Sequence, residues 1–225
     1  MVNFSKREKI KSIVLFLALI ICQFFTYSLF DALGVQISEN GITIVIHIFV
    51  MLLAALCFRK GLLEDFKALK GRSWAILKDV VPTMAVGILV VYAVAMFCGM
   101  IVSAQDTEIS QTLSEVVPLG IAAIFLAPIS EELIFRYGLF NTLYPRSRKA
   151  AYIVTAVLFG LIHIWDKLLA LDFAGMFAMV PRIVFGLYAA QIYEKSKHIC
   201  YPIFYHAIHN ATGCLLKILL LLFGT

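Results

Sequence analysis

The chain has 225 residues, of which 62% are hydrophobic and 15% are charged, and its mean hydropathy is +0.93. Soluble domains carry about 25% charged and about 45–50% apolar residues, so this composition excludes an ordinary water-soluble domain and predicts a polytopic membrane protein. The net charge of +5 comes from short basic segments and not from a basic stripe interleaved with aromatic residues, which excludes a nucleic-acid-binding surface.

Apolar stretches of membrane-spanning length recur along the whole chain. A spanning helix needs about 20 largely apolar residues. Seven stretches meet or approach this length, and they predict an all-α, polytopic transmembrane helical bundle. The expected spans are residues 12–30, 41–58, 80–102, 116–144, 150–165, 172–193 and 199–223.

Basic residues alternate between the connections of these spans. The N-terminal tail carries four, segment 59–79 six, segment 145–149 three and segment 194–198 two, together fifteen of the nineteen Lys and Arg. The connections 31–40 and 103–115 carry none. The positive-inside rule therefore predicts a cytoplasmic N-terminus and, with seven spans, a C-terminus outside.

Segment 59–79 combines these basic residues with Leu and Phe at roughly helical spacing. This pattern predicts an amphipathic helix lying on the cytoplasmic membrane surface, with Trp74 anchored among the headgroups.

The fourth expected span carries three ionisable side chains, Glu131, Glu132 and Arg136. An ionisable residue in hydrocarbon costs at least ~2.5–3.5 kcal/mol, so such residues usually mark a functional site. Glu132 and Arg136 are four residues apart and share a helix face, which predicts a buried ion pair. Glu131 is rotated by about 100° and would serve a cavity as a general base. A structural polar network between helices is the alternative interpretation.

Two later spans carry polar pairs at the same spacing. His163 follows Phe159 by four residues, and Asn210 follows His206 by four. An imidazole and an amide side by side can donate two hydrogen bonds to one developing oxyanion. Hydrogen bonding between helices is again the alternative, but three such pairs on three separate helices favour chemistry.

Four further polar residues in or near the apolar stretches carry a weaker indication of function. We expect Arg182 and His209 to be structural, and His47 and His198 have no recognisable sequence context.

The three pairs resemble the signatures of the CPBP family, which comprises CAAX proteases and bacteriocin-processing enzymes and is also called the Abi family. Its motifs EExxxR, FxxxH and HxxxN read here as Glu131-Glu132-Leu-Ile-Phe-Arg136, Phe159-Gly-Leu-Ile-His163 and His206-Ala-Ile-His-Asn210. They occur in the family's order, and the resemblance covers about residues 116–223.

The resemblance implies an intramembrane endopeptidase whose motif residues lie on three C-terminal core helices. It implies that Glu131 and His163 activate the hydrolytic water and that His206 and Asn210 hold the oxyanion. Glu132, Arg136 and Phe159 would support the site. Residues 1–115 would then form N-terminal membrane helices, three spans with the cytoplasmic amphipathic segment, and residues 116–225 the catalytic membrane core.

The depth of these residues favours a cavity open towards the cytoplasm. At a rise of 1.5 Å per residue, Glu131, His163 and His206 lie roughly 15, 20 and 10 Å from the cytoplasmic ends of their spans.

No cofactor is expected, because the resemblance implies a metal-free glutamate mechanism and the sequence has no HExxH motif. Zinc bound by Glu131, His163 and His206 is the alternative. The expected partners are a peptide or protein substrate and the lipid bilayer, and the expected location is a bacterial plasma membrane. Two other functions stay open: a non-catalytic role of the same fold in bacteriocin self-immunity, and a proton-coupled transporter, which the lack of an internal repeat disfavours.

Overall fold

The computed structural model describes residues 1–34, 39–69, 71, 73–102 and 113–223. Every regular element in these ranges is helical, which confirms the expected all-α bundle. The elements are α1 (Lys6–Ala32), α2 (Glu39–Leu69), α3 (Ser73–Val102), α4 (Leu113–Glu132), the π-helix η1 (Leu133–Phe140), α5 (Asn141–Leu143), α6 (Arg148–Leu161), α7 (Trp165–Leu169), the 3₁₀ helix η2 (Gly175–Ala178), α8 (Met179–Ser196) and α9 (Cys200–Phe223).

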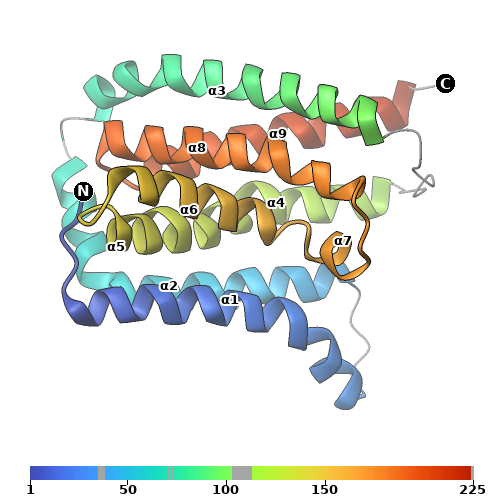
Figure 1. Cartoon of the computed structure of the whole chain (residues 1–225), viewed down its shortest axis with the longest axis horizontal. Helices are drawn as coiled ribbons and strands as arrows, with labels where there is room; N and C mark the ends of the chain where they lie inside the picture. Colours follow the sequence, from blue (N-terminus) through green and yellow to red (C-terminus); the bar gives the residue numbers. More distant parts are fainter. Residues whose placement is uncertain (35–38, 70, 72, 103–112, 224–225) are drawn as a thin grey trace.

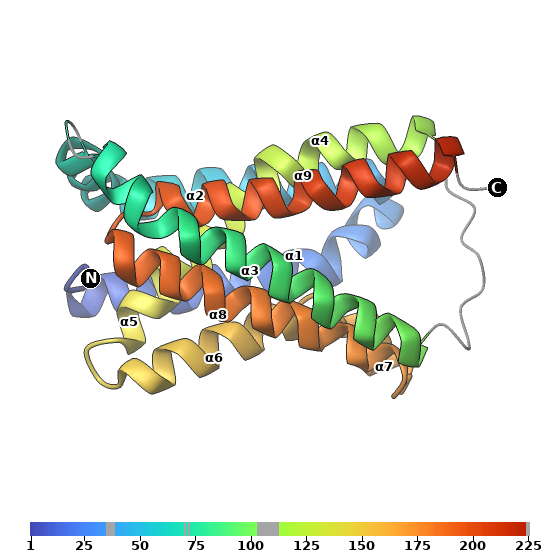
Figure 2. The same ribbon diagram turned by 90° about the horizontal axis from the view of Figure 1, so that it is seen from above.

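The long helices run back and forth along one axis of the molecule (Figure 1). The N-terminus, the α5–α6 connection and the α8–α9 connection lie together at one end, and the C-terminal end of α9 lies at the other (Figures 1 and 2). Hydrogen bonds hold the segments at this end together: the Val2 amide donates to Asn141 Oδ1 on α5 at 3.1 Å, and the Ile199 amide donates to Asp65 Oδ2 on α2 at 3.1 Å. We call this end, which carries the basic N-terminal tail and segments 145–149 and 194–198, the basic end.

Five helices are long and apolar enough to cross a membrane, as judged by length and composition within the described ranges. They cover Lys6–Thr26, Gly41–Leu69, Ser73–Gly99, Gly175–Ser196 and Cys200–Phe223. The two other expected spans correspond to α4 with η1, and to α6. With 14 residues, α6 is about 21 Å long, shorter than the ~30 Å hydrocarbon core.

The segment expected to form one amphipathic helix is divided between two helices, so that prediction was wrong. α2 continues to Leu69 and α3 begins at Ser73, with Gly71 between them at a φ of +80°, a left-handed conformation that favours glycine. Lys70 and Arg72 lie outside the described residues. The last part of α2 nevertheless turns across the basic end (Figure 1), and Trp74 is exposed there as expected of an anchor.

The π-helix η1 forms the centre of the bundle. All eight of its residues are buried, and it packs against α1, α2, α6 and α8. At Gly61 of α2, an added Cβ would collide with the Tyr137 hydroxyl, so this glycine allows α2 to approach η1 closely. π-turns occur frequently at functional sites, and this one starts directly after the two glutamates.

Candidate active site

The expected ion pair between Glu132 and Arg136 is confirmed. Arg136 Nη1 lies 3.1 Å from Glu132 Oε1, and both side chains are fully buried. Arg136 Nη2 donates a second hydrogen bond to the Gly186 carbonyl oxygen on α8 at 3.1 Å. The guanidinium also lies 4.8 Å from the centre of the Phe159 ring, close enough for a cation–π contact. Arg136 therefore connects η1 to both α6 and α8.

His206 is oriented by the same carboxylate. Its Nδ1 lies 2.9 Å from Glu132 Oε1. Because that carboxylate is paired with Arg136 and acts as an acceptor, Nδ1 carries the hydrogen. The other ring nitrogen, Nε2, lies 3.9 Å from Glu131 Oε2. The ring packs against Phe185 at a centroid distance of 4.6 Å, which fixes its plane.

His163 approaches Glu131 from another helix. It lies two residues beyond α6, and its Nδ1 donates to the Phe159 carbonyl oxygen at 2.7 Å. A carbonyl oxygen only accepts, so Nδ1 carries the hydrogen and Nε2 keeps its lone pair. This Nε2 lies 3.8 Å from Glu131 Oε2. The FxxxH spacing thus orients the imidazole through the backbone of the first motif residue.

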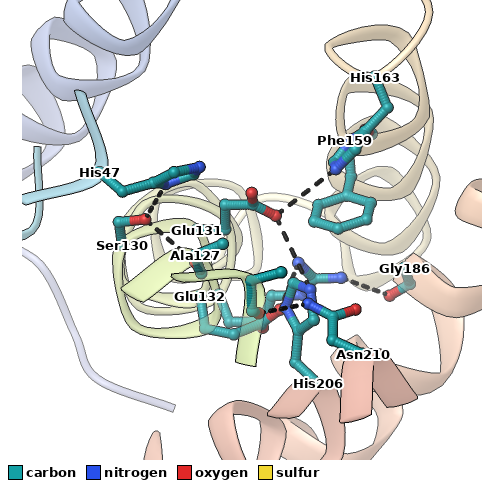
Figure 3. Close-up of polar contacts among 12 residues, drawn as sticks. His47, Ala127, Ser130, Glu131, Glu132, Phe159, His163, Gly186, His206 and Asn210 are labelled. Carbon is teal, nitrogen blue, oxygen red and sulfur yellow. Dashed lines mark hydrogen bonds and ion pairs between the residues drawn. The ribbon is translucent and has the colours of Figure 1, made fainter. Parts of the chain in front are cut away.

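Glu131 lies between these two rings (Figure 3). It is only 5% exposed, and its Oε2 atom has no hydrogen-bond partner within the described part of the chain. Distances of 3.8 and 3.9 Å to the two Nε2 atoms are too long for direct hydrogen bonds. As expected, Glu131 faces away from the Glu132–Arg136 pair and into a cavity.

The cavity has a volume of about 700 Å³ and is lined by Glu131, Phe159, His163, His206 and Asn210, among others. The Asn210 amide nitrogen donates to the Ala123 carbonyl oxygen at 2.7 Å, which uses one of its two hydrogens. The structure therefore brings the expected water-activating and oxyanion residues to one space. Glu132 and Arg136 are packed behind it.

The cavity extends away from the basic end. Its lining residues on α4 run from Glu131 back to Leu119, and those on α9 run from His206 forward to Lys217. α4 begins and α9 ends at the end of the bundle opposite the N-terminus (Figure 1). A cytoplasmic N-terminus and a cavity open towards the cytoplasm, both expected above, therefore do not agree with each other.

Comparisons with known proteins match the half of the chain that contains the site. Residues 113–212, which include all three motifs, match the sequence model of the family described as "Type II CAAX prenyl endopeptidase Rce1-like". This part of the chain is similar to the CAAX proteases of the CPBP family.

A relative from Bacillus subtilis (strain 168) is called "Putative membrane peptidase YdiL". It is 29% identical over 108 residues, which make up 47% of this chain and 40% of that protein. The match thus spans less than half of the relative. No solved structure matches the chain. The long apolar helices and these matches indicate an integral membrane protein whose residues 113–212 are similar to the CPBP family.

Three further polar side chains of the cavity are not signature residues of the CPBP motifs. His47 on α2, Arg182 on α8 and His209 on α9 all line the cavity. Arg182 and His209 had been expected to be structural, and His47 had no sequence context. The available signal was the position of each side chain in an apolar stretch, which by itself suggests function. None of the three has a partner at a recognisable sequence spacing.

The described residues include no group of three or more His, Cys, Asp and Glu side chains arranged to hold a metal ion. The expected zinc ligands were Glu131, His163 and His206. Glu131 Oε2 lies 3.8 Å from His163 Nε2 and 3.9 Å from His206 Nε2.

Proposed function

We propose that the protein is an intramembrane endopeptidase that hydrolyses a peptide bond of a peptide or protein substrate. One observation carries this proposal: the buried Glu131 carboxylate lies in a cavity beside His163 Nε2, at 3.8 Å, and His206 Nε2, at 3.9 Å. Such a set contains a proton acceptor and groups that can orient water and bind an oxyanion, and hydrolysis of an amide needs all of these.

In the proposed reaction, a water molecule donates one hydrogen bond to Glu131 and the other to His163 Nε2. Its oxygen attacks the substrate carbonyl carbon while Glu131 takes the first proton. The tetrahedral intermediate then collapses, the C–N bond breaks, and Glu131 returns the proton to the leaving amine. Because His163 Nδ1 donates to the Phe159 carbonyl, the neutral ring presents Nε2 to the water as an acceptor.

His206 and Asn210 are the proposed donors to the oxyanion. Asn210 keeps one amide hydrogen beyond the one given to Ala123. The Nδ1 hydrogen of His206 is committed to Glu132, so Nε2 donates only when the ring carries a second proton. Glu132 and Arg136 thus support catalysis by fixing the position of His206.

The basic end provides the proposed orientation. By the positive-inside rule it lies in the cytoplasm, with the N-terminus, in a bacterial plasma membrane. The cavity extends towards the opposite end, so we propose that substrates enter from the outer side of the membrane. This replaces the expectation of a cytoplasm-facing cavity, which rested on depth alone.

The test is cleavage by the purified protein, reconstituted in lipid vesicles, of a library of fluorogenic membrane-anchored peptides. Glu131→Gln keeps the shape of the side chain but cannot accept the proton, so we expect cleavage to be abolished while thermal stability in detergent is kept. Glu64→Gln, an exposed carboxylate on α2, is the matched control and should cleave like wild type. Near-wild-type turnover by Glu131→Gln would exclude Glu131 as the base.

A further inference from the structure

His47 reaches the site from the half of the chain that carries no family motif. It lies on α2, outside the matched residues 113–212, yet its ring lines the same cavity as Glu131. Figure 3 shows the ring beside the Glu131 carboxylate, on the side away from His163. The mechanism proposed above leaves this imidazole without a role.

The hydrogen bonds of His47 define which of its nitrogens is available. Nδ1 lies 2.8 Å from the Ser130 hydroxyl oxygen, and that hydroxyl donates to the Ala127 carbonyl oxygen at 3.0 Å. Since a hydroxyl has a single hydrogen, Ser130 accepts from His47 Nδ1–H. The Nε2 atom of His47 is therefore a lone-pair acceptor, and the ring presents it on the Glu131 side (Figure 3).

The three imidazoles around Glu131 are oriented by the same kind of hydrogen bond. Each has its Nδ1 hydrogen directed to a fixed acceptor: the Ser130 hydroxyl for His47, the Phe159 carbonyl for His163 and the Glu132 carboxylate for His206. The partner of one ring nitrogen determines the state and direction of the other. The Nδ1 contact thus directs Nε2 of His47 by the same means as in His163, where Nε2 is also an acceptor; in His206 it fixes the direction of the ring.

We propose that His47 is a water-positioning residue of the active site. This inference rests on the proposed hydrolytic function. The attacking water gives its two hydrogens to Glu131 and His163. A second water molecule, on the other side of the carboxylate, gives one hydrogen to Glu131 and the other to His47 Nε2, in a cavity whose remaining walls are mainly apolar. His47 thereby extends the site to α2, which the family motifs do not reach.

Two substitutions separate this role from a structural one. In His47→Asn, the amide nitrogen can replace the Nδ1 donor to Ser130, but nothing replaces the Nε2 acceptor. We expect unchanged thermal stability, unchanged KM and a kcat lowered by roughly 10- to 100-fold, the range for a misplaced reactant. His47→Ala should lose as much kcat, and added imidazole should restore part of it by entering the vacated space.

His198→Ala is the matched control. His198 is also buried, but it lies at the basic end, accepts a hydrogen bond from the Cys200 amide at Nδ1, and does not line the cavity. Imidazole should not change its turnover. A normal kcat in His47→Asn, a loss confined to KM, or equal imidazole responses of the His47→Ala and His198→Ala variants would each overturn the proposal.

A readout without proteolysis keeps the two proposals distinguishable. In protein labelled with ¹⁵N-histidine, the Nε2 resonance of His47, identified by its loss in His47→Asn, should have the shift of an unprotonated nitrogen and show contact with water. A protonated or dry Nε2 would overturn the role of His47 even if the wild type cleaves peptides. A hydrated acceptor in a protein that cleaves nothing would instead refute the endopeptidase proposal alone.

Discussion

Removing one partner of the Glu132–Arg136 pair should strongly destabilise the protein. The atoms lie 3.1 Å apart and both side chains are fully buried. Two unit charges about 4 Å apart attract each other by about 4 kcal/mol at an effective dielectric constant of 20, and breaking a buried pair costs ~3–5 kcal/mol because one charge stays uncompensated. For a chain of this size each kcal/mol lowers Tm by about 2–4 °C, so we expect a loss on the order of 10 °C.

The assay is thermal unfolding in detergent of Glu132→Gln, Arg136→Met and the double variant. The double variant should be less destabilised than the sum of the two single variants by at least about 1 kcal/mol, since it leaves no lone charge. It should not regain wild-type stability, because the Gly186 carbonyl loses its donor and His206 Nδ1 donates to a neutral amide oxygen in place of a carboxylate. Arg148→Met removes an exposed guanidinium from Glu194 and should change Tm much less. Strict additivity would refute the coupling of Glu132 and Arg136.

Three further predictions concern activity and access. Prolonged treatment with a strong chelator should leave cleavage intact, and the purified protein should contain much less than one metal ion per chain; loss of activity that added zinc restores would show a metal-bound water instead. Asn210→Ala should lower turnover by ~10²–10³-fold, the cost of losing an oxyanion donor, and unaffected turnover would remove Asn210 from the site. The third test labels single cysteines with a membrane-impermeant maleimide in a background without the native cysteines. Leu119→Cys should react in intact cells, whereas Lys60→Cys at the basic end should react only after permeabilisation. The reverse pattern would place the cavity on the cytoplasmic side.

The sequence predicted the parts of the site that depend on spacing within one helix. Glu132 and Arg136 meet as their four-residue separation requires, and Glu131 is turned towards the cavity by its rotation about the helix axis. The pair forms although Arg136 lies in the π-helix, which begins at Leu133, directly after Glu132. No local pattern indicated that π-turn, since its stability comes from the helices that bury it on every side.

Features that depend on packing between distant segments escaped prediction. His47 is a single histidine in an apolar stretch, and only the fold brings it to Ser130, 83 positions later. The sequence also did not determine the direction of the cavity. The depth of a residue along its helix can be counted from the sequence. The packing of α2, η1 and α8 decides which end of the bundle is filled by large side chains and which end holds the cavity. The apolar residues of segment 59–79 keep a helical spacing on both sides of Gly71, so their pattern predicts one helix where the structure has two.

The carbonyl of Gly186, which accepts the hydrogen bond from Arg136, also belongs to the point where α8 touches α6. A Cβ at this position would lie 2.9 Å from Ala156 Cα, an atom of the α6 backbone that cannot move aside on its own. Any side chain here would push α6 outwards, and His163 follows the end of that helix. Because Gly186 lacks a Cβ, α6 can lie close to α8, and the distance between His163 and Glu131 depends on this close approach. The geometry of the proposed base therefore depends on a glycine in another helix.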